Sequence, residues 1–220
     1  RNAMESGDKV IMFTSTAPGE GKSVTTVNLA AIYAKNGENI LLMDCDIRNS
    51  GIRKLINNNE LEIKDKVYDE NGEILYSISR VENLDIDLLS FNYKEKNLSK
   101  MLNMQVNMHG LEEIVNSLRE KYDLIFIDTP PCGMIADAAI VAAVADGAVY
   151  VIRQDTVMDT NIRQGLDTLV RLMGCILNGA VGGIGGYGSS YGYGYGYSGY
   201  KKYYRNYKYY GKSGYRKNKY

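Results

Sequence analysis

The chain has 220 residues, enough for one domain with a full hydrophobic core, and its 26 basic and 26 acidic residues give a formal net charge of zero. Its three cysteines lie far apart without paired metal-ligand spacing, which argues against a disulfide framework or a zinc site and fits a reducing cytosol. No apolar run reaches the roughly 20 residues of a membrane-spanning helix, and no signal peptide is visible.

Apolar runs rich in β-branched residues alternate with helical patterns along the chain. Strands are predicted at residues 10–15, 39–44, 123–128 and 147–152, with weaker candidates at 84–89 and 176–181. Helices are predicted at residues 23–36, 111–121 and 160–173, and a loop or small excursion without clear period at 57–79. Because the strong strands are apolar almost throughout, they predict an α/β fold with a mostly parallel sheet and helices on both faces. Ligands of such sheets bind beyond the carboxyl ends of the strands.

The first predicted strand runs into the sequence TSTAPGEGKSVTT, which has the core of a phosphate-binding loop. Gly19 and Gly21 let the backbone fold its N–H groups around phosphate oxygens, and the following helix adds its positive N-terminal end. Lys22 is expected to neutralise the β and γ phosphates of a nucleotide, and the Ser23 hydroxyl is expected to ligate Mg²⁺. The pattern G-x-x-x-x-G-K-S is incomplete, since Thr16 stands where its first glycine belongs.

Acidic residues stand at the ends of two further strands. In LLMDCDIR, Asp44 and Asp46 are two residues apart, so both carboxylates can face one pocket. In LIFIDTPP, Asp128 follows a run of apolar residues, where a carboxylate is costly unless it has a function. Holding Mg²⁺ through water beside a phosphate loop is the function we expect for Asp128. The alternative for Asp44 is an N-cap of the turn that follows it.

The end of the chain differs in composition from the rest. Thirteen of the nineteen tyrosines lie between Gly186 and Tyr220, among glycines, lysines and arginines and without an aliphatic residue. Such a stretch cannot bury enough apolar surface to offset the entropy of ordering, so we predict a flexible tail over residues 182–220. From Gly179 onward there are eight basic and no acidic residues, which makes the tail about +8 and the body about −8.

The segments PGEGKS, LLMDCDIR and LIFIDTPP, followed by a terminal tyrosine cluster, resemble the Walker A, Walker A′ and Walker B motifs of the bacterial tyrosine kinases of capsule and exopolysaccharide synthesis. The resemblance runs from about Val10 to the terminus and is weakest between Asn57 and Asn107. It implies a P-loop ATPase fold related to the partitioning and septum-site ATPases. It also implies ATP and Mg²⁺ as cofactors, and transfer of the γ-phosphoryl group to tyrosine hydroxyls.

The resemblance further implies roles for single residues. Lys22, Asp44 and Asp46 are the expected catalytic residues, with Asp44 facing the tyrosine hydroxyl. The expected metal-binding residues are Ser23, Asp46 and Asp128. The expected nucleotide-binding residues are Ala17, Pro18, Gly19, Glu20, Gly21, Lys22, Ser23, Val24 and Asn178, the last matching an asparagine that contacts adenine in related ATPases. The expected phosphorylation sites are Tyr187, Tyr191, Tyr193, Tyr195, Tyr197, Tyr200, Tyr203, Tyr204, Tyr207, Tyr209, Tyr210, Tyr215 and Tyr220.

The chain departs from the family pattern in two places. Ser50 stands in DIRNS where the family commonly has proline, which we expect to loosen the turn without removing a chemical group. Residues 1–9 are predicted to be the remnant of a subunit-contact segment, which in the family carries an E-x-x-R-x-x-R motif. Ring assembly is therefore expected only of the intact protein, and residues 10–181 are predicted to form the kinase domain.

By resemblance, the kinase is a homo-oligomer in the cytoplasm. It is expected to be recruited to the inner face of the plasma membrane by a transmembrane activator of the polysaccharide co-polymerase type. We expect phosphorylation of the tail between subunits, because a Gly-rich coil of 34 residues from Tyr187 spans roughly 29–35 Å whereas a 180-residue globule has a radius of gyration of roughly 16 Å. Each phosphotyrosine adds about −1.5 to −2 charges, so phosphorylation is expected to weaken the hold of the tail on an acidic neighbour.

Two other functions stay open from the sequence. A regulatory ATPase of the ParA or MinD kind would hydrolyse ATP and dimerise, but that group typically has a lysine where this chain has Ala17. A nucleic-acid-binding protein would stack bases on the tail tyrosines, whereas the kinase is expected to bind no nucleic acid. Phosphotyrosine formed with Mg-ATP separates the kinase from both.

Overall fold

The computed structural model describes residues 7–46, 50–56, 61–68, 72, 74–91, 107–132, 137–154, 157, 159–167, 169 and 171–180. Within these ranges the chain forms an eight-stranded sheet in the order β3-β4-β5-β2-β6-β1-β7-β8. Its parallel part consists of β5 (Ile86–Phe91), β2 (Ile40–Asp44), β6 (Leu124–Asp128), β1 (Val10–Ser15), β7 (Gly147–Arg153) and β8 (Leu172–Asn178). The hairpin of β3 (Leu61–Tyr68) and β4 (Ile74–Val81) adds two antiparallel strands beside β5.

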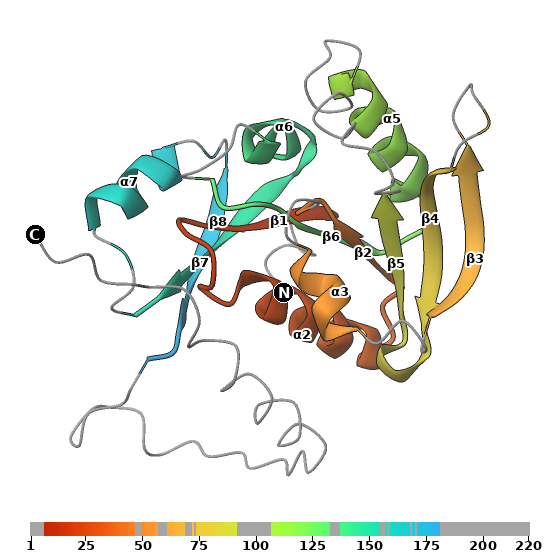
Figure 1. Ribbon diagram of the computed structural model, residues 1–220, viewed down its shortest axis with the longest axis horizontal. Coiled ribbons are helices and arrows are strands. Elements are labelled where there is room, and N and C mark those ends of the chain that lie inside the picture. The colour runs from red at the N-terminus through yellow and green to blue at the C-terminus, as the bar shows by residue number, and fades with distance from the viewer. Residues whose placement is uncertain are drawn as a thin grey trace, which may run out of the picture. The chain divides into compact units, whose positions relative to one another are not determined.

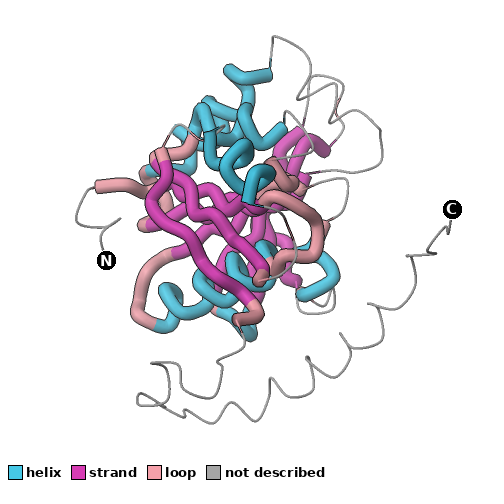
Figure 2. The backbone as a smooth tube through the Cα atoms, turned by 90° about the vertical axis from the view of Figure 1, so that its left-hand side faces the viewer, coloured by secondary structure: helices cyan, strands magenta, loops and turns pink. Residues whose placement is uncertain are grey.

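Helices cover both faces of the sheet (Figure 1). The helices α2 (Lys22–Lys35) and α3 (Gly51–Leu55) pack on one face, and α5 (Asn107–Arg119) and α6 (Asp137–Val144) pack on the other. The helix α7 (Asp159–Asp167) follows β7, and a short 3-10 turn (Glu82–Leu84) joins β4 to β5. Figure 2 shows the strands as a layer between helices on either side.

The alternation of side chains along the central strands divides the core into two layers. In β1, Val10 and Met12 pack in the layer of α5 and α6, whereas Ile11 and Phe13 pack in the layer of α2 and α3. Because both faces are covered, these strands are buried along their whole length, as their continuous apolar sequence predicted.

The predicted α/β fold, with a mostly parallel sheet and helices on both faces, is confirmed. The strand predicted at residues 10–15 has those bounds, and the other three strong strands differ from prediction by one residue at one end. The helix predicted at 160–173 is wrong in its second half, because α7 ends at Asp167 and Leu172 begins β8. Residues 172–178 pair in parallel with β7 instead, so the strand predicted at 176–181 also begins four residues earlier and ends at Asn178.

The β3–β4 hairpin and the helix α6 had no clear signal in the sequence. The segment predicted as a loop or small excursion at 57–79 contains β3 and most of β4. β3 is an exposed edge strand, and Asp65 interrupts its alternation of apolar and polar residues. The helix α6 has the sequence DAAIVAAV, which is apolar nearly all round and so lacks an amphipathic period. Both elements are fixed by what they pack against rather than by their own pattern.

The residues described above belong to one compact unit that ends at Ala180. In this part of the chain, no helix has both the length and the apolar character needed to span a bilayer. The predicted tail at 182–220, with all thirteen of its tyrosines, lies outside the described residues, as do residues 1–6. The predicted domain boundaries therefore stay predictions.

Candidate nucleotide and phosphotransfer site

The register of the central strands brings the three motifs together at one edge of the sheet. Asp128, the last residue of β6, pairs with Asp44 at the end of β2 on one side and with Phe13 of β1 on the other. Two residues after Phe13, β1 ends and the chain enters the loop that leads into α2. The two acidic motifs and the phosphate loop therefore meet beyond the carboxyl ends of neighbouring parallel strands, where such sheets bind their ligands.

The loop between β1 and α2 has the backbone of a phosphate-binding loop. Gly19 has a φ of 85° and Gly21 a φ of 91°, and residues with a side chain adopt such angles only with strain. No such angle occurs at Thr16, so the glycine expected there is not needed in this chain. Instead, the Thr16 hydroxyl lies 2.9 Å from the hydroxyl of the buried Tyr150 in β7. The incomplete motif is thus compatible with the loop.

Further hydrogen bonds tie this loop to itself and to β7 and β8. The backbone N–H of Ala17 donates to the buried Glu20 carboxylate over 2.7 Å. Asn178 Nδ2, at the end of β8, donates to the Glu20 carbonyl over 2.9 Å, and the Arg153 guanidinium donates to the Gly19 carbonyl over 3.2 Å. The structure thus brings Asn178, predicted to contact adenine, directly against the phosphate loop.

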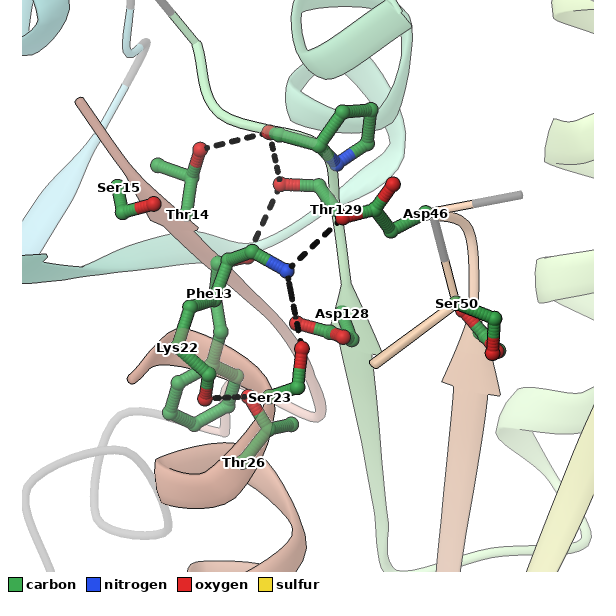
Figure 3. Close-up of polar contacts among 12 residues, drawn as sticks. Phe13, Thr14, Ser15, Lys22, Ser23, Thr26, Asp46, Ser50, Asp128 and Thr129 are labelled. Atoms are coloured by element: carbon green, nitrogen blue, oxygen red, sulfur yellow. Dashed lines mark hydrogen bonds and ion pairs between the residues drawn. The ribbon is translucent and has the colours of Figure 1, made fainter. Parts of the chain in front are cut away.

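Lys22, the first residue of α2, is surrounded by the groups predicted to act with it (Figure 3). Its ammonium donates to Asp128 Oδ1 over 2.5 Å and lies 3.6 Å from Asp46 Oδ2 and 3.4 Å from Ser23 Oγ. Burial raises the pKa of the Asp128 carboxyl, while the charge of Lys22 opposes this rise. The side chains of Lys22, Ser23, Asp46 and Asp128 therefore form one cluster, as predicted from their motifs.

Asp44 lies beside this cluster on the neighbouring strand and is fully buried. Burial raises the pKa of its carboxyl to about 6, and the negative charges of Asp128 and Asp46 add to this effect. A hydrogen bond donated by the Ser50 hydroxyl to Asp44 Oδ2 acts in the opposite direction. The alternative that Asp44 caps the turn after it stays open, because residues 47–49 lie outside the described residues. The N-cap of α3 is Ser50, which accepts from the Arg53 N–H.

The cluster fits a magnesium ion that is held mainly through a nucleotide. Asp128 Oδ2 is buried and has no hydrogen-bond partner in the described part of the chain. The atoms around Lys22 that could bind a metal ion, on Ser23, Asp46 and Asp128, are oxygens. The described residues contain no group of three or more His, Cys, Asp or Glu side chains arranged as a metal cage. Mg²⁺ rarely uses such cages, because it keeps several waters and is bound through one or two carboxylates plus substrate phosphates.

Several functional contacts of this site were not predicted. The hydroxyl of Tyr150 and the guanidinium of Arg153 hold the loop. Tyr150 occurs in an apolar run that predicted only a strand, and Arg153 follows directly after that run and ends β7. Ser50 was expected to loosen a turn, but it makes two hydrogen bonds instead. The signal for Ser50 was present, since a serine before a short helix is a favoured N-cap.

Comparison with known proteins identifies the relatives of this chain. The profile of the AAA domain family matches residues 8–176. The tyrosine-protein kinase YwqD of Bacillus subtilis (strain 168) is 29% identical over 175 residues, which cover 78% of this chain and 72% of YwqD. The tyrosine-protein kinase CpsD of Streptococcus pneumoniae serotype 4 is 31% identical over 155 residues, which cover 68% of this chain and 66% of CpsD.

The solved structures agree with this relationship. The crystal structure of the VpsO kinase domain superposes with a TM-score of 0.64 at 28% identity, covering 80% of this chain and 87% of that domain. The kinase domain of the Escherichia coli tyrosine kinase ETK, at 24% identity and a TM-score of 0.69, supports the same fold. The family predicted from the three motifs is confirmed, and the match to the AAA domain supports nucleotide binding. The chain belongs to the AAA domain family and, within it, to the bacterial tyrosine kinases.

Proposed function

We propose that this chain transfers the γ-phosphoryl group of ATP to tyrosine hydroxyls, those of its own tail included, in capsule or exopolysaccharide synthesis. The observation that carries the proposal is the cluster of Lys22, Asp46 and Asp128 beside the buried Asp44. It combines a phosphate-neutralising cation, metal-binding oxygens and a proton acceptor at the end of one sheet. Phosphoryl transfer needs these parts, because catalysis of this reaction rests on positioning and charge neutralisation.

The residues would act as follows. The loop N–H groups and the Lys22 ammonium bind the β and γ phosphates. The ammonium, which lies against Asp128 and Asp46 in the structure, would then turn toward the nucleotide. Mg²⁺, held by Ser23 Oγ and by Asp46 and Asp128 with water between, would neutralise the charge that develops on the phosphates. The bond between the tyrosine oxygen and the γ phosphorus forms as the bond to the β-phosphate oxygen breaks.

The phenol proton would pass to Asp44. A pKa of about 6 makes this carboxylate a better proton acceptor than an exposed aspartate, which titrates near ~4. It stays well below the ~10 of the phenol, so the proton moves late, when the phosphoryl group is already leaving ATP. Burial of Asp44 would thus serve the reaction by making its carboxylate more basic.

We further propose that the tail tyrosines from Tyr187 to Tyr220 are phosphorylated between subunits of a homo-oligomer. The relatives' names support a tyrosine kinase, and the reach and charge of the tail support transfer to a neighbour. A cytoplasmic location and recruitment to the membrane by a transmembrane activator rest on the family resemblance. The ATPase alternative is less favoured, because Ala17 occupies the place of the second lysine and its N–H is bonded to Glu20.

The experiment that tests the proposal compares Asp128→Asn with Asp44→Asn. Wild type incubated with Mg-ATP should become reactive to an anti-phosphotyrosine antibody, and intact mass should rise by whole phosphoryl groups. Calorimetric titration of Mg-ADP should show weaker binding to Asp128→Asn and near wild-type binding to Asp44→Asn, while both lose phosphotyrosine. ATP hydrolysis by wild type without any phosphotyrosine would favour the regulatory ATPase instead, and equal loss of affinity would refute the division of roles.

A further inference from the structure

A serine at the start of α3 contacts the proposed proton acceptor directly. Ser50 Oγ accepts a hydrogen bond of 3.1 Å from the Arg53 N–H and donates to Asp44 Oδ2. The direction of each bond is fixed, because a backbone N–H only donates and a serine hydroxyl carries one hydrogen. The single O–H of Ser50 is therefore committed to the Asp44 carboxylate.

The first turn of α3 is also held against the rest of the site. Gly51 lies so close to Ser23 that a Cβ at this position would overlap the Ser23 hydroxyl. On its other side, the Arg53 guanidinium donates to the carbonyl of Phe91 at the end of β5 over 3.5 Å, and Ile52 is fully buried in the core. The place of Ser50 is thus set by packing on both sides, so its hydroxyl is a fixed point and not a mobile surface group.

We propose that Ser50 is a positioning residue for phosphoryl transfer, which fixes the Asp44 carboxylate in the orientation that receives the tyrosine proton. This inference rests on the proposed kinase function. A fixed donor favours one orientation of the Asp44 carboxylate, which is buried beside two other acidic residues whose charges repel it. Without the Ser50 hydroxyl, we expect the carboxylate to turn toward the Lys22 ammonium, whose positive charge acts on it, and away from the tyrosine hydroxyl.

Three substitutions separate this role from the capping of α3. Ser50→Thr keeps the hydroxyl and should retain most of the wild-type kcat. Ser50→Gly remains a fair N-cap but has no hydroxyl, and Ser50→Ala loses both properties. Because a hydrogen bond to a charged group is lost in both, Ser50→Gly and Ser50→Ala should each lower kcat about tenfold, with KM for ATP and Kd for Mg-ADP within about twofold of wild type. Wild-type kcat in Ser50→Gly, with a loss only in Ser50→Ala, would show capping alone and overturn the proposal.

A double-mutant cycle tests whether Ser50 acts through Asp44, and it does not need an active enzyme. Ser50→Ala should lower the urea midpoint of unfolding more in the wild-type background than in Asp44→Ala, where the partner is gone. Equal shifts in both backgrounds would overturn the pairing. If the shifts in urea midpoint are coupled but wild type forms no phosphotyrosine, the pairing of Ser50 with Asp44 is supported and the proposed kinase function is refuted. The two failures are therefore distinguishable.

Discussion

Lys22 has a structural role in addition to binding phosphate. Its ammonium compensates two carboxylates, one of which, Asp128, is fully buried. Removing one partner of a buried charge pair typically costs about 3–5 kcal/mol, because the other charge is left uncompensated. A variant that loses the lysine is therefore expected to lose both activity and stability, and the two effects must be measured separately.

We predict that Lys22→Met abolishes phosphotyrosine and lowers the free energy of unfolding by about 3 kcal/mol at pH 8. The loss should be smaller at pH 5, because burial raises the pKa of Asp128 and removal of the lysine raises it further. A folded-state pKa above the unfolded value means that stability falls as pH rises. Urea unfolding at both pH values measures this, and the double variant Lys22→Met/Asp128→Asn should recover most of the stability. Equal losses at both pH values would contradict it.

Removing the charge of Asp44 should have the opposite effect to removing Lys22, because ionisation of the buried Asp44 carboxyl lowers the free energy of unfolding. The pKa of this carboxyl is about 6 in the folded chain against 3.8 for an ordinary aspartate, so the folded state binds its proton more tightly. The stability contributed by the protonated form is present below pH 4 and is lost as the pH rises to about 6. At 1.4 kcal/mol per pH unit, the ionised carboxylate costs about 3 kcal/mol at neutral pH.

We therefore predict that Asp44→Asn abolishes phosphotyrosine but raises the free energy of unfolding at pH 7 without nucleotide, by about 1–3 kcal/mol. The amide can still accept from Ser50 and carries no charge to be buried. Thermal unfolding at pH 7 and pH 4 provides the measurement and its control, because the gain should shrink at pH 4, where wild-type Asp44 is largely protonated. A variant less stable than wild type at pH 7 would show that the Asp44 charge is stabilised by contacts that outweigh its burial.

The phosphate loop shows how one strand constrains a neighbouring element. Both Gly19 and Gly21 have positive φ, but only at Gly21 would a Cβ overlap Asn178 at the end of β8. At Gly19 the same atom would meet nothing within 4 Å. An alanine at either position would therefore be strained by the positive φ, but only an alanine at Gly21 would also overlap Asn178.

We predict that Gly19→Ala costs about 1–2 kcal/mol of stability through left-handed strain alone, whereas Gly21→Ala costs more and displaces Asn178. The affinity for Mg-ADP, measured by calorimetry, should fall further in Gly21→Ala than in Gly19→Ala. Adding Asn178→Ala to Gly21→Ala should recover part of the difference in stability. Identical behaviour of the two alanine variants would mean that the Asn178 contact does not shape the loop.

The elements also show what the sequence could and could not predict. Buried parallel strands and the acids at their ends were predictable, because continuous apolar runs and glycine-rich loops have few alternative structures. The β3–β4 hairpin and α6 were not, since β3 is an exposed edge strand and α6 has no polar face. Within the site, Lys22, Asp46 and Asp128 were predictable from motifs, whereas the contacts of Tyr150 and Arg153 depend on the register of β7 beside β1 and cannot be read locally.

For the molecule as a whole, the separation of charge favours contact between chains. The predicted tail carries about +8 and the body about −8, so we expect a tail to be attracted to any body within reach. A coil of 34 residues, as predicted from the composition, would be long enough to reach a neighbouring body. Each phosphotyrosine adds about −1.5 to −2 charges to the tail. Roughly four or five modified tyrosines would cancel the charge of the tail, so we expect phosphorylation to weaken the association that promotes it.

Transfer of the phosphoryl group between chains can be tested by mixing two variants. Asp44→Asn with an intact tail is the better substrate chain, because it is expected to be inactive yet stable, whereas Lys22→Met is expected to be destabilised. The enzyme chain keeps its site but lacks residues 187–220, so it cannot label itself on the tail. Mixed with labelled ATP, the two should place the label on the longer chain, and the rate should rise with the concentration of either.

Salt provides the control for the expected attraction between the positive tail and the acidic body. Attraction between exposed charges is screened beyond about 8 Å at physiological ionic strength, so raising the salt should slow labelling of the substrate chain. ATP affinity of the enzyme chain, measured in parallel, shows whether salt acts on the site instead. Wild type that labels itself at a rate independent of protein concentration, while the mixed chains stay unlabelled, would establish transfer within one chain. The positive tail would then serve to bring its tyrosines to the acidic body of its own kinase.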